Sequence, residues 1–167
     1  PAAAFRFVDA AFAISTSAST ATEPKLAVLT HAALIAAADA SAARLGWNDD
    51  DRWLLCLPPH RIGGLSIVLR CLWAQRSVVL LPKFSATAVA AACARPAVTL
   101  LSLVPAMLRE LLDLQPAWQP PATLRAVLLG GASASAQLLR DARERGVMVL
   151  PTYGMTETAA QVATVAP

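Results

Sequence analysis

The stretch LRAVLLGGASASAQLLRDARERGVMVL, residues 124–150, decides the fold. Its apolar run 124–129 predicts a strand, residues 135–145 predict a helix, and the apolar run 147–150 predicts the next strand. Neither run alternates apolar with polar residues, which is typical of strands covered on both faces. Strand, helix and strand in this order favour a parallel pair joined by a helical crossover.

The rest of the chain repeats this pattern. Further strands are expected over 11–15, 26–29, 53–57, 78–81 and 98–101, and further helices over 31–44, 65–73, 86–94 and 105–112. Thr30 is a suitable N-cap for the first helix and Gly46 a suitable terminator. The predicted fold class is therefore α/β, with a mostly parallel sheet carrying helices on both faces, as a single subdomain over residues 1–167.

Composition excludes several classes of function. The net charge is only +3 and the basic residues form no stripe, so no nucleic-acid partner is expected. No run reaches the ~18 apolar residues that span a bilayer, so no membrane span is expected. Cys56, Cys71 and Cys93 lack metal-type spacing and lie in apolar segments. They are interpreted as buried reduced thiols, which favours a cytoplasmic location.

Ligands of such sheets bind where loops leave the carboxyl ends of the strands. One such loop, Ser15–Lys25, has the sequence STSASTATEPK. Its hydroxyls and terminal lysine could wrap a polyphosphate, although a solvated hydroxyl-rich loop explains them equally well. It lacks the glycines of the GxxxxGK(S/T) phosphate loop.

Two later segments also carry chemistry. Gly130-Gly131-Ala132 ends a predicted strand, and consecutive glycines allow a flat ligand to approach the backbone, as they would allow a plain turn. Residues 151–158, PTYGMTET, combine an aromatic ring, a glycine, hydroxyls and the carboxylate of Glu157. A carboxylate beside phosphate oxygens is suited to Mg²⁺, and the alternative is a turn capped by Thr156.

These segments together resemble a known family. Tyr153-Gly154-Met155-Thr156-Glu157 is similar to the YGxTE motif of the adenylate-forming, or AMP-binding, superfamily. Residues 16–25 resemble its (S/T)SGTTGxPK phosphate loop, and Pro58–Leu65 resembles the HxxGL segment of an aryl-CoA ligase branch that includes o-succinylbenzoate–CoA ligase. The resemblance covers almost the whole chain. It implies a central subdomain of an acyl- or aryl-CoA synthetase.

The resemblance implies ATP, Mg²⁺ and coenzyme A as cofactor and cosubstrates, with an aromatic carboxylic acid as substrate. It assigns the β- and γ-phosphates of ATP to Thr16, Ser17, Ser19, Thr20 and Lys25. It assigns the adenine and acyl walls to Gly130, Gly131, Ala132, Tyr153 and Gly154. Thr156 would contact the α-phosphate, Glu157 would bind Mg²⁺, and His60 would be the pocket histidine. The family's mobile C-terminal domain with its lysine is missing from this chain, so the isolated chain is not expected to complete the reaction.

The sequence also departs from the family. Ala18 and Ala21 replace two loop glycines, and alanine does not cheaply adopt positive φ. Aligned on Gly63-Gly64, the family's histidine position holds Arg61, and His60 comes one residue earlier. A surface or core histidine without function explains His60 equally well. These departures leave a second hypothesis open: a non-catalytic homologue that serves as a binding or scaffold module.

Overall fold

The structure, a computed structural model, describes residues 9–16, 25–95 and 98–165. In these ranges the elements are β1 (Ala10–Ser15), β2 (Leu26–Thr30), α1 (His31–Leu45), β3 (Arg52–Leu55), α2 (Ile62–Trp73), β4 (Ser77–Leu80), α3 (Ala86–Cys93), β5 (Leu100–Leu103), α4 (Pro105–Leu112), β6 (Ala126–Leu129), α5 (Ala136–Glu144), β7 (Val149–Met155), the 3-10 turn η2 (Thr156–Thr158) and β8 (Ala160–Thr164).

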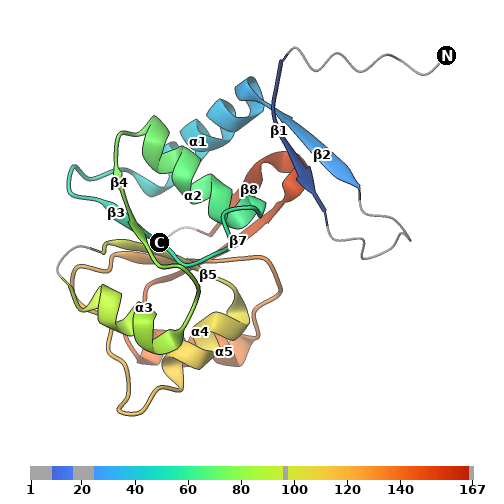
Figure 1. The fold of residues 1–167 in the computed structure, drawn as a ribbon. Coiled ribbons are helices and arrows are strands. Elements are labelled where there is room, and N and C mark those ends of the chain that lie inside the picture. Colours follow the sequence, from blue (N-terminus) through green and yellow to red (C-terminus); the bar gives the residue numbers. More distant parts are fainter. Residues whose placement is uncertain (1–8, 17–24, 96–97, 166–167) are drawn as a thin grey trace.

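The main sheet has six strands in the order β4-β3-β5-β6-β7-β8, and β1 and β2 form a separate antiparallel hairpin. Every pair in the main sheet is parallel except β7 and β8. Helices α1 and α2 lie on one side of this sheet, and α3, α4 and α5 lie on the other (Figure 1). The prediction of a mostly parallel sheet between two helical layers is confirmed.

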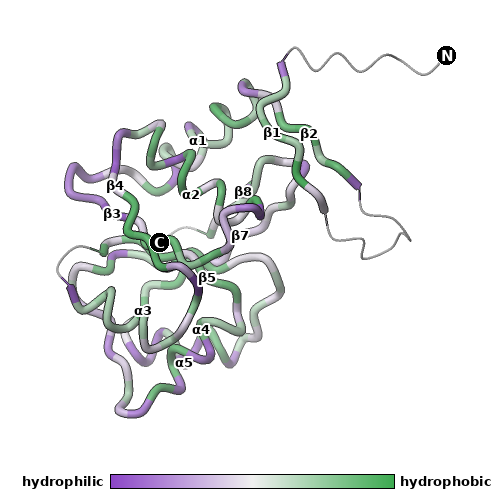
Figure 2. Tube along the Cα trace, viewed as in Figure 1, coloured by the Kyte–Doolittle hydropathy of each residue, from purple (hydrophilic) through white to green (hydrophobic). Residues whose placement is uncertain are grey.

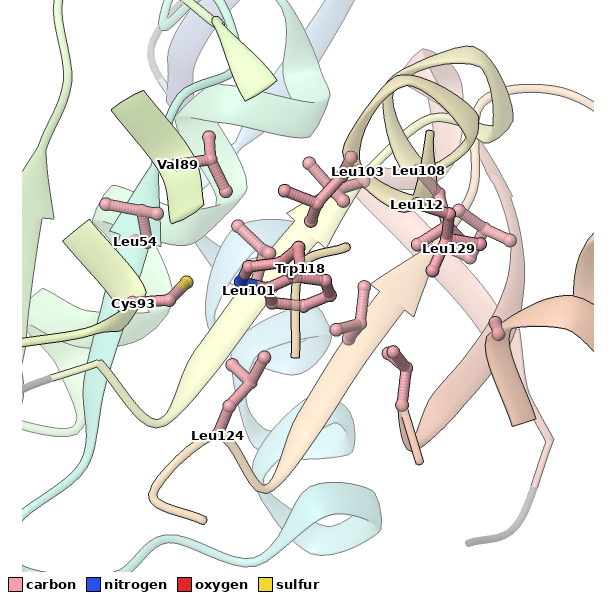
Figure 3. Close-up of a cluster of buried hydrophobic side chains, with 14 of the residues drawn as sticks. Leu54, Val89, Cys93, Leu101, Leu103, Leu108, Leu112, Trp118, Leu124 and Leu129 are labelled. Atoms are coloured by element: carbon pink, nitrogen blue, oxygen red, sulfur yellow. The ribbon is translucent and has the colours of Figure 1, made fainter. Parts of the chain in front are cut away.

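Both faces of the central strands are buried, which explains their unbroken apolar sequences. Trp53 and Leu55 of β3 pack with Ile67 of α2, whereas Leu54 between them packs with Val89 of α3. Figure 3 shows the cluster that contains Leu54 and Val89, with Leu101 and Trp118 in its middle. Figure 2 shows the hydrophobic colour along the strands in the middle of the molecule. Successive side chains of a strand point to opposite faces, so two apolar layers favour an apolar residue at nearly every position.

Local signals set the helix ends. The Thr30 hydroxyl accepts a hydrogen bond from the Ala33 N–H at 3.2 Å, and Gly46 ends α1 with a φ of 63°. Pro105 occupies the first turn of α4, where its missing N–H removes no helical bond. The predicted caps of α1 and the predicted start of α4 are confirmed.

A charged clamp joins the amino ends of three parallel strands. Asp51, Thr99 and Arg125 lie just before β3, β5 and β6, respectively. The Arg125 guanidinium donates to both oxygens of Asp51, at 2.8 and 2.6 Å, and the Thr99 hydroxyl donates to one of them at 2.7 Å. Burial raises the pKa of Asp51, but the hydrogen bonds from Arg125 and Thr99 outweigh it, so the pKa is lowered overall.

The three cysteines are buried and free, as predicted. Burial raises the pKa of Cys56 to about 11 and the pKa values of Cys71 and Cys93 to about 12, so all three thiols are protonated at neutral pH. Among the described residues, no helix combines the length and apolarity needed to cross a membrane.

The end of the chain differs from the sequence prediction. The last strand was expected over 147–150, with Tyr153 in a loop, but β7 continues to Met155 and pairs with β8. The cause is Gly154: a Cβ at this position would lie only 1.8 Å from the Ala160 carbonyl oxygen. Because glycine lacks that atom, the two backbones meet as a ladder. A segment of threonines, tyrosine and glycine gives no apolar run to indicate such a strand.

Candidate functional site

A cavity of about 170 Å³ opens at the carboxyl ends of the parallel strands. Ser102 of β5, Gly130 after β6 and Thr152 of β7 line it from the sheet. Arg70 of α2 and Gln161 of β8 line it from the side of the sheet that carries α1 and α2. Of the four segments singled out from the sequence, three contribute residues to this lining: 58–65, 130–132 and 151–158.

Small residues keep this space open. A Cβ on Gly130 would lie 2.4 Å from the Thr152 hydroxyl oxygen, and Gly131 has a φ of 79°, which L-residues rarely adopt. The Thr152 hydroxyl in turn donates to the Leu129 carbonyl at 3.2 Å. The Gly130-Gly131 turn is therefore shaped by close packing against β7 as well as by its position at a strand end.

Arg70 brings a buried positive charge to the cavity. Its side chain belongs to a residue only 5% exposed, and its guanidinium lies 5.7 Å from the centre of the Trp53 ring. One terminal nitrogen, Nη2, is buried without a hydrogen-bond partner among the described residues. Burial lowers the pKa of Arg70 to about 10, with nearby Cys71 acting in the opposite direction, so the group is charged at neutral pH. A buried cation with an unused donor is costly unless a ligand supplies an acceptor.

Two further polar groups line the same cavity. The Trp53 indole N–H donates to the Ser102 hydroxyl oxygen at 3.0 Å, so the hydroxyl proton of Ser102 is free to point elsewhere. Gln161 bonds the Thr164 hydroxyl through its amide nitrogen, and its amide oxygen is buried without a partner among the described residues. The cavity thus combines an apolar wall with a cation, a hydroxyl donor and a carboxamide, an arrangement suited to an organic acid.

Sequence reasoning missed Arg70, Ser102 and Gln161 as site residues. In the sequence, Arg70 interrupts the long apolar run 63–81. A single arginine at a helical position that is otherwise apolar was the available signal, because such a charge must face a ligand, a partner or solvent. Ser102 and Gln161 carry no comparable signal in the sequence.

The hydroxyl-rich loop is closed at its base. The Thr16 amide and hydroxyl both donate to the Lys25 carbonyl, at 2.8 and 3.2 Å. Lys25 is exposed. The predicted phosphate-binding residues Ser17, Ser19 and Thr20, and the altered positions Ala18 and Ala21, lie outside the described residues.

Only part of the YGMTE segment lines the cavity. Gly154 lines the cavity, while Tyr153 is 63% exposed and Glu157 is exposed in η2. Thr156 is half-buried, and Met155, not Thr156, occupies the N-cap position of this turn. The aromatic ring and the carboxylate are therefore both accessible from solvent, and neither lines the cavity.

A small apolar cluster holds the predicted site segments together. Ile14 of β1, Leu29 of β2 and Ala159 after η2 are buried against each other, and Ile62 and Leu65 of α2 pack on them. The base of the hydroxyl-rich loop, the turn with Glu157 and the start of α2 are thereby joined. His60 and Ala132 are exposed and do not line the cavity.

Comparisons with known proteins agree with this geometry. A family model described as "AMP-binding enzyme" matches residues 5–167. A 2-succinylbenzoate–CoA ligase of Bacillus cereus (strain Q1) is 39% identical over 96% of this chain, which covers 33% of that protein. The o-succinylbenzoate coenzyme A synthetase of Bacillus subtilis, in complex with ATP and magnesium, has a TM-score of 0.86 at 37% identity over 93% of this chain and 32% of its own.

A second structure of the Bacillus subtilis synthetase, bound to a product analogue, has a TM-score of 0.89 at 36% identity. The match covers 96% of this chain and 33% of the Bacillus subtilis chain. The Escherichia coli synthetase has a TM-score of 0.77 at 32% identity over 92% of this chain and 32% of its own. The chain therefore spans about a third of the length of these relatives.

Proposed function

Because the chain belongs to the AMP-binding enzyme family, we propose that it is the central part of an ATP-dependent acid–thiol ligase. The longer protein would join a carboxylic acid to AMP, with release of pyrophosphate, and then transfer the acyl group to coenzyme A. The substrate would be an aromatic acid with a second carboxylate, of which 2-succinylbenzoate is the example named by the relatives.

Arg70 is the observation that carries this proposal. Arg70 lines a cavity that is otherwise largely apolar, its buried Nη2 has no hydrogen-bond partner among the described residues, and the group is charged at neutral pH. A carboxylate that accepted from Arg70 and from the Ser102 hydroxyl would satisfy the buried charge, while an aromatic ring would fill the apolar space. An acid with a single carboxylate could fill the same space. Its one carboxylate could occupy either the reacting position or the position beside Arg70, and the other position would stay empty.

The remaining residues would hold the nucleotide. We assign the β- and γ-phosphates to Thr16, Lys25 and the hydroxyls between them, and the α-phosphate to Thr156. Glu157, exposed in η2, suits Mg²⁺, whose other ligands would be phosphate and water oxygens. Bound ATP and Mg²⁺ supply the adenylyl group and neutralise phosphate charge. The residues of this chain position the acid and the phosphates, which is the main protein contribution in such a reaction.

Other parts of the catalytic cycle belong to segments outside these residues. We propose that the reaction requires the small C-terminal domain, and that the longer enzyme works in the cytoplasm. On this basis the 167-residue chain binds ligands without turning them over. Binding is accordingly the quantity that tests the proposal.

The test compares 2-succinylbenzoate with 4-oxo-4-phenylbutanoate, which keeps the ring and side chain but lacks the ring carboxylate. Calorimetric titration of the chain should show tighter binding of the diacid. Arg70→Met, which keeps the volume but removes the charge, should weaken diacid binding by about ten- to a hundredfold and leave the monoacid little changed. Arg143→Met, at an exposed position on α5, is the matched control.

Equal affinities of the folded wild-type and Arg70→Met chains for the diacid would refute the proposed substrate class. The rival hypothesis of a non-catalytic module predicts a different result. It predicts that neither this chain nor the longer protein binds AMP or ATP in the presence of Mg²⁺.

A further inference from the structure

We propose that Arg61 binds the β- and γ-phosphates of ATP, and so the pyrophosphate that leaves, as a second cation beside Lys25. The proposal rests on the proposed function, and adds to it a residue outside the cavity. Arg61 immediately precedes α2, and its side chain is exposed. Its position depends on three features of the fold: a rigid turn, a contact to the hairpin and the apolar cluster beneath both.

The turn before α2 holds the Arg61 backbone in place. The Arg61 N–H donates to the Pro58 carbonyl at 3.1 Å, and the Arg61 carbonyl accepts from the amides of Gly64 and Leu65 at 3.1 and 2.9 Å. The turn is tight enough that a Cβ on Gly64 would lie 2.3 Å from the Pro58 oxygen. The side chain of Arg61 therefore starts from a well-defined point.

From this point the guanidinium crosses to the hairpin. Its Nη1 donates to the carbonyl of Ser15, the last residue of β1, at 3.4 Å. Thr16, the next residue, closes the base of the hydroxyl-rich loop with Lys25. Among the described residues this is the only hydrogen bond of the Arg61 side chain, so most of its N–H donors remain open to a ligand.

The apolar cluster places a cation, the loop base and a carboxylate on one packed unit. Ile14 adjoins Ser15 in the chain, Ile62 adjoins Arg61, and Ala159 follows Glu157 by two residues. Since Ile14 and Ala159 are buried in this cluster and Ile62 packs on it, the backbone that carries Ser15, Arg61 and Glu157 is anchored to one packed unit. Mg²⁺ held by Glu157 and the guanidinium of Arg61 would then approach the phosphates together.

An arginine suits this place for two reasons. Its planar fork can donate two parallel hydrogen bonds to phosphate oxygens, and it stays charged over the whole pH range in which ATP is bound. His60, one residue earlier, is exposed and makes no side-chain hydrogen bond among the described residues. Arg61 is thus the group of this turn that reaches the loop base.

The experiment is calorimetric titration of the 167-residue chain with AMP, with ATP and with pyrophosphate, each with Mg²⁺. Arg61→Ala should weaken ATP and pyrophosphate binding by about tenfold or more and change AMP binding less than twofold. Arg61→Lys keeps the charge without the fork and should give an intermediate loss. Arg52→Ala removes an exposed arginine at the opposite end of the sheet and controls for net charge.

The outcomes separate this inference from the proposed function. If Arg61→Ala binds ATP and pyrophosphate as the wild type does, or loses AMP binding equally, Arg61 is not a polyphosphate ligand, although the proposed function stands. The same conclusion follows if the wild-type chain binds AMP but no pyrophosphate. If the wild-type chain binds none of the three, both the inference and the proposed function fail. Unfolding midpoints of all variants, measured by circular dichroism, exclude loss of structure as the cause.

Discussion

Replacing Arg125 by methionine should strongly destabilise the chain, because Asp51 would lose its main partner. The Asp51 side chain is fully buried, whereas the Arg125 side chain is 26% exposed. Removing one member of a buried ion pair typically costs about 3–5 kcal/mol. The Thr99 hydroxyl and the Asn48 N–H still donate to Asp51, so the lower end applies, about 3 kcal/mol. At roughly 2–4 °C per kcal/mol for a chain of this size, the unfolding midpoint should fall by roughly 6–12 °C.

The deficit should also depend on pH. In the wild type the pKa of Asp51 lies below its ordinary value of 3.8, so the stability it contributes is present above that value and is lost as the pH falls through the folded pKa. In Arg125→Met, burial acts on Asp51 without the arginine and raises its pKa. As the pH falls, Asp51 is therefore protonated in the variant before it is protonated in the wild type, which removes the buried unpaired charge. The difference in free energy of unfolding between the two proteins should shrink between about pH 7 and about pH 4.5.

Urea denaturation followed by circular dichroism at the two pH values measures both effects. Combining Asp51→Asn with Arg125→Met removes the unpaired buried charge and should recover part of the lost stability. Comparing the double variant with both single variants gives the coupling free energy between the two residues. A deficit below about 1 kcal/mol at neutral pH, or an equal deficit at both pH values, would refute the assignment of the clamp as a buried ion pair that holds the sheet.

Three further predictions concern single positions. Gly154→Ala places a Cβ 1.8 Å from the Ala160 oxygen, so it should cost at least about 2 kcal/mol of stability and weaken AMP binding. Gly146→Ala is the control: Gly146 has a φ of 76° but no neighbour within 4 Å, so this change should cost only about 1 kcal/mol. Denaturation measures the stability of both variants, and nucleotide titration measures their AMP binding. Thr30→Ala should cost about 1 kcal/mol in the same denaturation assay, since it removes the cap of α1. The buried thiols, with pKa values of about 11 and 12, should react with a thiol reagent near pH 8 only after unfolding, and prompt reaction of the native chain would contradict their burial.

Features encoded in short segments could be predicted from the sequence. The apolar runs that became β3, β5 and β6, the cap at Thr30 and the α4 start at Pro105 each depend on neighbouring residues only. Features that join distant segments could not be predicted. The clamp unites Asp51 and Arg125 across 74 positions, and nothing local marks either residue as buried.

The candidate site divides in the same way. The YGMTE segment and the Gly130-Gly131 turn were singled out by their residue types and assigned to the site by the family resemblance, but the strand that continues through Tyr153 was not predicted. Its pairing with β8 depends on the absence of a Cβ at Gly154, and the pattern of apolar residues in the sequence gives no sign of that close approach. Arg70 is recognised as a site residue only from the fold, which places α2 beside the cavity. The same arginine on a solvent-exposed helix would be an ordinary surface charge.

The contrast between two arginines strengthens the case for an acidic ligand. Arg125, at the amino ends of the strands, donates to both oxygens of Asp51 and to the carbonyls of Leu45 and Gly46. Arg70, at the carboxyl ends, is more deeply buried, yet it has a ring beneath it and an unpaired Nη2 among the described residues. The same fold that saturates one guanidinium leaves the other incomplete at the edge where ligands of parallel sheets bind. An unsatisfied buried donor of this kind costs about 1–3 kcal/mol, more when charged, and under the proposed function a carboxylate of the substrate would supply the missing acceptor.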